Sequence, residues 1–163
     1  MDRVNSVNFV SFWCIAAALL LGLALPRPAA AQDREVPYWA SLTADKVNMR
    51  VGPARDYRIA WVFRRDKLPM KVVRLHEGWR LVEDPDGARG WVLSRFLSRR
   101  RTALVTGAIA EMREGPGSGR LLWRLEPGVV AELGDCASGW CQLRIRDRAG
   151  YVRADRLWGD GPP

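Results

Sequence analysis

The sequence contains the same seven-residue motif twice. "VNMRVGP" at residues 47–53 recurs 63 positions later as "AEMREGP" at residues 110–116. Three aromatic landmarks follow in the same order in both copies: Trp61 as Trp123, Gly78-Trp79 as Gly139-Trp140, and Gly90-Trp91-Val92 as Gly150-Tyr151-Val152. Each copy is about sixty residues long, and a solenoid needs about three or more repeats to bury its faces. The repeat therefore predicts two tandem globular domains.

Each copy reads as a series of short strands. In the first copy, "PMKVVRL" at 69–75 is rich in β-branched residues, "WRLVE" at 79–83 alternates along its length, and "RGWVL" at 89–93 is a brief apolar run. Turn chemistry separates them, as in "DPDG" at 84–87, where Pro85 and Gly87 suit a tight reversal. Short strands at this spacing predict an all-β chain made of small, strongly bent sheets or barrels.

The first 31 residues have the pattern of a secretory signal peptide. A nearly uncharged apolar run is followed by "PRPAAAQ", which offers Ala29 and Ala31 as the small residues before cleavage at Gln32. An uncleaved membrane anchor is the alternative, because the run is long enough to cross a bilayer. We expect cleavage, and hence an exported, periplasmic protein with no membrane span after the signal is removed.

The charge is basic and evenly spread. The whole chain has 26 Lys+Arg and 18 Asp+Glu; removing residues 1–31 leaves 24 and 17, a net charge of +7. Residues 32–98 carry +4 and residues 99–163 carry +3. Such a surface favours anionic partners. For an exported chain these are peptidoglycan carboxylates, acidic envelope proteins or lipid head groups, and not nucleic acid, although a basic surface also serves solubility alone.

Two cysteines remain after signal cleavage, because Cys14 lies inside the apolar run. Cys136 and Cys141 flank "ASGW", so they can face one another across a tight hairpin. In an oxidising compartment such a pair predicts a disulfide. The alternative, a metal or redox site, lacks further ligands nearby and lacks the Cys-x-x-Cys spacing.

These motifs resemble the bacterial SH3-like domain family, and particularly exported proteins that carry two such domains. The resemblance rests on "NMRVGP" and "EMREGP", "EGW" and "SGW", "RGWVLSRFL" and "AGYVRADRL", and the junction "SRRRTALV". It implies SH3-like domains at residues 40–98 and 102–158. It also implies five-stranded barrels with a short 3₁₀ turn near "SRF" and "ADR", and binding of cell-wall peptides or proteins rather than catalysis.

The repeat and the resemblance together give six candidate binding residues. The Gly-Trp position corresponds to the groove tryptophan of the wider SH3 family, so Trp79 and Trp140 either contact a ligand or pack in the core. Arg50 and Arg113 either hold their own loops or meet a ligand carboxylate. The candidate residues are Trp79, Trp140, Arg50, Arg113, Tyr57 and Phe96. Four other aromatic residues are expected in the thin cores: Trp61, Trp91, Trp123 and Tyr151.

Catalysis is not expected. The chain has one His, no Gly-x-Ser-x-Gly elbow, no cluster of metal ligands and no phosphate loop, and we expect no cofactor. The sequence thus predicts a non-catalytic binding or adaptor protein of the cell envelope. Two alternatives stay open, namely a structural component of an envelope assembly and a diffuse binder of anionic envelope surfaces.

Overall fold

The computed structural model describes residues 35–163, which form two antiparallel sheets of seven strands each. The predicted signal peptide, residues 1–31, and Cys14 lie outside the described residues. No helix among residues 35–163 has the length and apolar content needed to span a bilayer. The expectation of an all-β fold with two tandem domains is confirmed.

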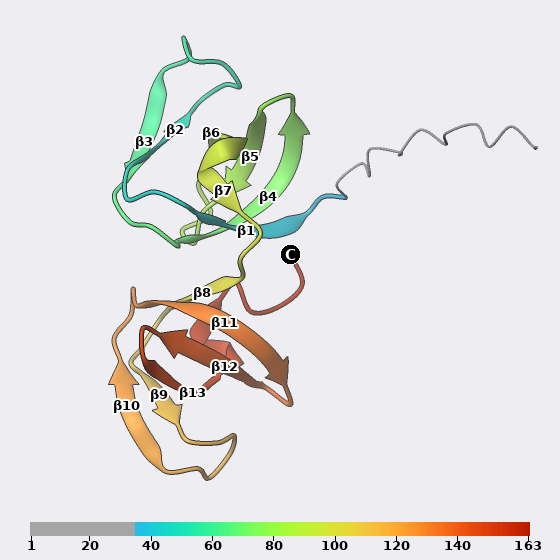
Figure 1. Cartoon of the computed structure of the whole chain (residues 1–163). Helices are drawn as coiled ribbons and strands as arrows, with labels where there is room; N and C mark the ends of the chain where they lie inside the picture. Colours follow the sequence, from blue (N-terminus) through green and yellow to red (C-terminus); the bar gives the residue numbers. More distant parts are fainter. Residues whose placement is uncertain (1–34) are drawn as a thin grey trace, which may run out of the picture. The chain divides into compact units, whose positions relative to one another are not determined.

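The first sheet is built from residues 38–98 and curls into a small barrel. Its strands are β1 (Tyr38–Leu42), β2 (Val47–Arg50), β3 (Ile59–Phe63), β4 (Pro69–His76), β5 (Trp79–Glu83), β6 (Arg89–Leu93) and β7 (Leu97–Ser98). They are ordered β3-β2-β6-β5-β4-β1-β7. Figure 1 shows the β2–β3 and β4–β5 hairpins as separate arms of this curled sheet.

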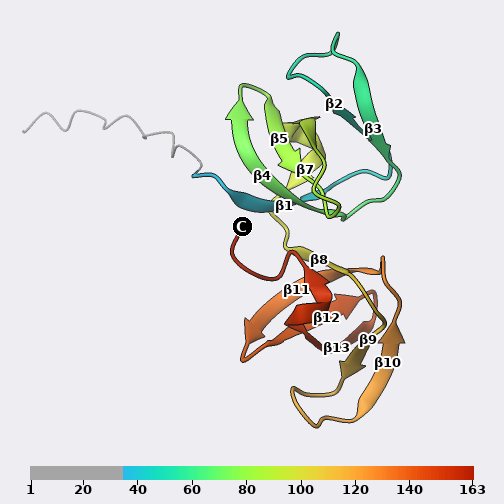
Figure 2. The ribbon, with the colours of Figure 1, turned by 180° about the vertical axis from the view of Figure 1, so that it is seen from behind.

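The second sheet repeats this plan from residue 102 onward. Its strands are β8 (Thr102–Val105), β9 (Ala110–Arg113), β10 (Leu121–Leu125), β11 (Val130–Ala137), β12 (Trp140–Ile145), β13 (Arg148–Arg153) and β14 (Leu157–Trp158). Their order, β10-β9-β13-β12-β11-β8-β14, matches the first sheet strand for strand. The view from behind in Figure 2 shows the corresponding β9–β10 and β11–β12 hairpins.

The two 3₁₀ turns implied by the resemblance are present. They are η1 (Ser94–Phe96) and η2 (Ala154–Arg156), each directly before the last short strand of its sheet. The strand number differs from the implied five. The first extended stretch is divided into two strands by a four-residue corner at 43–46, and a two-residue strand after η1 pairs with the first strand.

Each core is formed by the side chains at every second position of its strands, which point to the inner face of the sheet. In β6, Gly90 and Val92 are buried while Trp91 between them is half-buried, because neighbouring residues of a strand point to opposite faces. The first core consists of Tyr38, Ala40, Leu42, Val47, Met49, Phe63, Met70, Val72, Val82 and Val92. Its counterpart in the second barrel is Ala103, Val105, Ala110, Met112, Leu125, Ala131, Cys141, Leu143, Val152 and Leu157.

The structure corrects the expected aromatic cores. Trp61 is 60% exposed and does not belong to the core. Trp91 and Tyr151 are half-buried, because each lies between two buried residues and therefore points to the outer face of its sheet. Only Trp123 packs against a core cluster as expected. The thin cores are filled mainly by aliphatic side chains and Met instead.

The junction between the barrels is held by its own arginines. The Arg99 guanidinium lies 3.4 Å from the centre of the Tyr38 ring of the first barrel. Arg101 donates a hydrogen bond to the carbonyl of Gly159, at 2.6 Å, and its burial lowers the pKa of its guanidinium. Each end of the junction is thus fixed to the barrel that it adjoins.

The second barrel contains the predicted disulfide. Cys136 of β11 lies opposite Cys141 of β12 in the ladder, and the two sulfurs are bonded. Cys141 is fully buried in the second core, so the bond ties an exposed hairpin to the core.

Reduction of this disulfide should lower the free energy of unfolding of the second barrel by about 2 kcal/mol, the chain-entropy value for a loop this small. Urea unfolding with and without reductant measures the change. Thiol labelling of the unreduced, denatured protein after signal cleavage should find no free sulfhydryl. Two reactive thiols would contradict the pairing.

Candidate basic pocket beside Trp79

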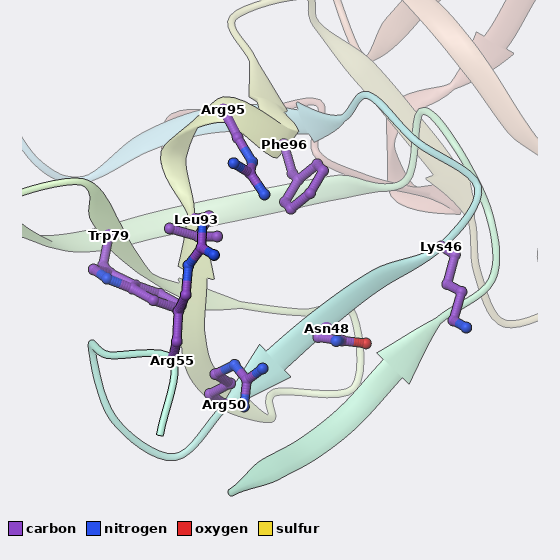
Figure 3. A pocket seen from close by; sticks show the side chains of 8 residues that line it. All are labelled: Lys46, Asn48, Arg50, Arg55, Trp79, Leu93, Arg95 and Phe96. Atoms are coloured by element: carbon purple, nitrogen blue, oxygen red, sulfur yellow. The ribbon is translucent and has the colours of Figure 1, made fainter. Parts of the chain in front are cut away.

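The candidate site is a pocket on the first barrel with a volume of about 260 Å³. It is lined by Lys46, Asn48, Arg50, Arg55, Trp79, Leu93, Arg95 and Phe96. Figure 3 shows Trp79, Leu93 and Arg55 gathered at one end of the pocket and Lys46 at the other. The lining residues come from three separate stretches of the chain, 46–55, 79 and 93–96.

Strand alternation places one wall of the pocket. Lys46, Asn48 and Arg50 follow one another at every second position along β2 and the residue before it, while Val47 and Met49 between them are buried in the core. Because successive side chains point to opposite faces, the polar residues of this stretch all point outward into the pocket. Burial of Val47 and Met49 in the core thus fixes the outward orientation of the polar side chains between and beside them.

Arg50 also holds the loop that follows β2. Its Nη1 donates a hydrogen bond to the carbonyl oxygen of Tyr57 at 2.5 Å. The Tyr57 ring packs on the backbone of Gly52, where an added Cβ would lie 2.5 Å from the ring. The absence of a side chain at Gly52 therefore lets the loop fold back on itself, and this brings Arg55 to the pocket.

Trp79 is a buried part of the wall. The residue is 7% exposed, and it opposes Leu93 of β6 in the ladder. The amide of Ser94 donates a hydrogen bond to the carbonyl of Gly78 at 2.8 Å, which fixes η1 next to the turn that precedes Trp79. Buried on one side and open to the pocket on another, the indole offers an apolar wall.

The third wall comes from η1. Arg95 is exposed, and its guanidinium lies 4.8 Å from the centre of the Phe96 ring. This is cation–π distance, so the aromatic ring orients the charge without neutralising it. Phe96 itself is half-buried against the first core.

The pocket is strongly electropositive. Its lining holds four basic residues, Lys46, Arg50, Arg55 and Arg95, and no carboxylate. Within the part of the chain that the structure describes, none of the four forms a salt bridge. Like charges held together without a counter-charge favour an anionic ligand.

The corresponding surface of the second barrel is partly neutralised by its own carboxylates. Arg113 donates a hydrogen bond to the carbonyl of Gly119 at 2.9 Å, as Arg50 does to Tyr57, but it also pairs with Glu111 at 2.5 Å. Arg153 pairs with Asp155 at 2.9 Å. The hydrogen bond from Arg153 holds the pKa of the Asp155 carboxyl below its ordinary value, and the same bond raises that of Arg153.

The six candidates from the sequence are thus divided between the two barrels. Trp79, Arg50 and Phe96 line one pocket, and Tyr57 is 47% exposed beside it, bound to Arg50 through its carbonyl. Trp140 and Arg113 lie half-buried in the second barrel. Both arginines hold their own loops, and ligand contact by any of the six stays a prediction.

Sequence reasoning missed five lining residues, namely Lys46, Asn48, Arg55, Leu93 and Arg95. For Lys46 and Asn48 a signal existed, because they precede Arg50 at intervals of two residues and alternate with the apolar Val47 and Met49, a pattern typical of a half-buried strand. No comparable signal pointed to Leu93 and Arg95, whose neighbours in space are distant in sequence. Across residues 35–163 no group of three or more His, Cys, Asp and Glu residues is placed to hold a metal ion.

Comparison with curated proteins finds no match. Among solved structures, the chain is similar to NlpC2 from Trichomonas vaginalis at 15% identity and a TM-score of 0.35, with 76% of this chain and 48% of that chain covered. It is likewise similar to NlpC1 from the same organism at 15% identity and a TM-score of 0.34, with 78% and 48% covered. This chain spans about half the length of those two structures. The model of the bacterial SH3 domain family matches residues 43–99 and 106–159, one match for each of the two sheets. The chain therefore belongs to this family.

Proposed function

We propose that this protein is a non-catalytic binding module of the cell envelope, and that its first barrel binds a carboxylate-bearing ligand in the pocket beside Trp79. A peptidoglycan stem peptide or an acidic segment of an envelope protein has the required chemistry. The single observation that carries the proposal is the set of four basic side chains around one pocket with no carboxylate in its lining.

The pocket has the two features that such a ligand needs. The guanidinium groups of Arg55 and Arg95 offer planar, paired donors that match a carboxylate in bidentate fashion. Trp79 and Phe96 supply flat apolar surface for the uncharged part of the ligand, at little cost in side-chain entropy because both are already held by packing. The resulting site combines a cationic rim with an aromatic wall.

The location in the envelope is supported by two observations. A match to the bacterial SH3 domain family favours a module associated with the cell wall, and the bond between Cys136 and Cys141 favours an oxidising, extracytoplasmic compartment. Export to the periplasm through cleavage of residues 1–31 is part of the same proposal.

The test compares charge removal inside and outside the pocket. The double variant Arg55→Ala/Arg95→Ala should be retained on purified peptidoglycan about tenfold less than the wild type, because it loses two charge-assisted contacts. The matched control is Arg74→Ala/Arg124→Ala, which removes the same charge from exposed positions of β4 and β10 outside the pocket lining. Its retention should equal that of the wild type.

Both double variants change exposed residues, so thermal melts should agree with the wild type. Equal loss of retention in the two variants, removed by moderate salt, would instead mean diffuse attraction of the whole basic surface, since screening weakens exposed charges first. No retention of the wild type on peptidoglycan or on envelope proteins would overturn the proposal and favour a structural role.

A further inference from the structure

Residues of the two barrels can be matched position by position from hydrogen bonds. Arg50 and Arg113 make the same loop contact, to the carbonyls of Tyr57 and Gly119. The amide of Thr43 donates to the carbonyl of Phe96, and the amide of Thr106 to the carbonyl of Arg156. Trp79 opposes Leu93 in its ladder as Trp140 opposes Arg153. The pocket positions therefore correspond as follows: Lys46 to Ile109, Asn48 to Glu111, Arg50 to Arg113, Leu93 to Arg153, Arg95 to Asp155, and Phe96 to Arg156.

The matched positions differ in net charge. The first barrel has four basic residues and no acidic one, a sum of +4. The second barrel has three basic residues, Arg113, Arg153 and Arg156, against two acidic residues, Glu111 and Asp155, a sum of +1. The loop that supplies Arg55 in the first barrel corresponds to residues 114–120 in the second, where the one basic residue, Arg120, pairs with Glu114 at 3.5 Å.

The three arginines at the matched positions of the second barrel already lie close to carboxylates of that barrel. Glu111 pairs with Arg113 and Asp155 pairs with Arg153, so two of its three guanidinium groups already have carboxylate partners. The third, Arg156, has its Nε 3.9 Å from the other oxygen of Asp155. A ligand carboxylate would have to compete with these internal partners, whereas in the first barrel it meets none.

The apolar part of the site differs as well. Two apolar lining residues of the first pocket, Leu93 and Phe96, are Arg153 and Arg156 in the second barrel. Trp140 therefore has charged side chains where Trp79 has apolar ones. The second barrel keeps the Gly-Trp turn of the repeat without the surroundings that make it a binding wall.

We propose that the two barrels have different roles. The first barrel alone binds, and its pocket selects ligands that carry free carboxylates, while the corresponding surface of the second barrel is closed to them by Glu111 and Asp155. This rests on the proposed function and adds to it which barrel binds and the stoichiometry. Asn48 and Arg95 are the positions that determine specificity, because their counterparts carry the opposing carboxylates.

The test exchanges these positions between the barrels and uses two probes in isothermal titration. The probes are a synthetic stem peptide with two free carboxylates and the same peptide with both carboxylates amidated. The wild type should bind one equivalent of the free peptide, and it should bind the amidated peptide about tenfold or more weakly, because the charge-assisted contacts are lost. Asn48→Glu/Arg95→Asp, which installs the second barrel's residues in the first, should abolish binding.

The reciprocal variant is Ile109→Lys/Glu111→Asn/Asp155→Arg with Arg153→Leu and Arg156→Phe, which installs every matched lining residue of the first pocket except Arg55. It should keep the first site and raise the stoichiometry toward two equivalents. All variants are checked by thermal melts and far-UV circular dichroism. Asn48→Glu/Arg95→Asp changes only the first barrel, and the reciprocal variant changes only the second. If one variant misfolds, the other still tests the proposal.

The outcomes separate this inference from the proposed function. If the wild type binds two equivalents, if it binds both peptides equally, or if binding survives Asn48→Glu/Arg95→Asp in a folded protein, the division of roles is overturned while the module still binds. If the wild type binds neither peptide and is not retained on peptidoglycan or envelope proteins, the proposed function itself fails.

Discussion

Trp79→Ala is expected to lower the free energy of unfolding of the first barrel by about 3 to 5 kcal/mol, the usual cost of truncating a buried Trp. The residue is 7% exposed, and a barrel of about sixty residues has little other apolar surface to compensate for the loss. Urea unfolding followed by far-UV circular dichroism measures the change. The variant should also lose binding, so by itself it cannot separate contact with the ligand from support of the fold.

The matched control is Trp61→Ala in the same barrel. Trp61 is 60% exposed, and surface substitutions of this kind usually change stability by less than about 0.5 kcal/mol. Unfolding curves that shift equally for both variants would show that Trp79 is not a supporting wall of the fold. Both variants replace Trp by Ala in the same barrel, so the difference between their free energies of unfolding reflects the difference in burial of the two side chains.

Gly90→Ala is expected to cost about 1 to 3 kcal/mol through overpacking. A Cβ at this position would lie 2.5 Å from the Met49 side chain and 2.9 Å from the carbonyl oxygen of Arg50. The Met side chain can move, but the backbone oxygen belongs to β2 and cannot shift without displacing the strand. Because β2 carries Asn48 and Arg50, the substitution should weaken ligand binding as well as stability.

Gly78→Ala serves as the control for this glycine. An added Cβ there meets nothing within 4 Å, and the residue does not have a positive φ. The free energy of unfolding should stay the same or rise slightly, because alanine restricts the unfolded chain. A loss at Gly78 as large as that at Gly90 would mean that glycine is needed at both places for backbone reasons and not for close packing.

The repeat and the turn chemistry were sufficient to predict the architecture. Two copies of one phrase, with strands separated by Gly and Pro turns, permit few folds other than two small β-domains, and the family match supports the same division. The disulfide was predictable for a similar reason, because Cys136 and Cys141 flank a turn short enough to force them together. These features depend on local geometry, and local geometry follows from neighbouring residues.

Burial of the tryptophans was not predictable in the same way. The repeat places Trp61 and Trp123 at equivalent positions, yet Trp61 is 60% exposed while Trp123 packs against its core. One difference lies across the sheet, where the Arg148 guanidinium is 5.4 Å from the centre of the Trp123 ring. What covers a side chain is decided by strands that are distant in the sequence.

The sequence by itself determined that this chain has two related β-domains, a disulfide hairpin and a basic surface. Only the tertiary structure decided that the basic residues form a pocket, because the curl of the sheet and the fold of one loop place Lys46, Arg55 and Arg95 around the same hollow. It also decided that the two copies differ at one surface, since the local pairs Glu111–Arg113 and Asp155–Arg153 are brought to the same place only by the pairing of β13 with β9. Net charges of +4 and +3 look alike when counted along the chain, but electrostatic interaction depends on the distances between the charges.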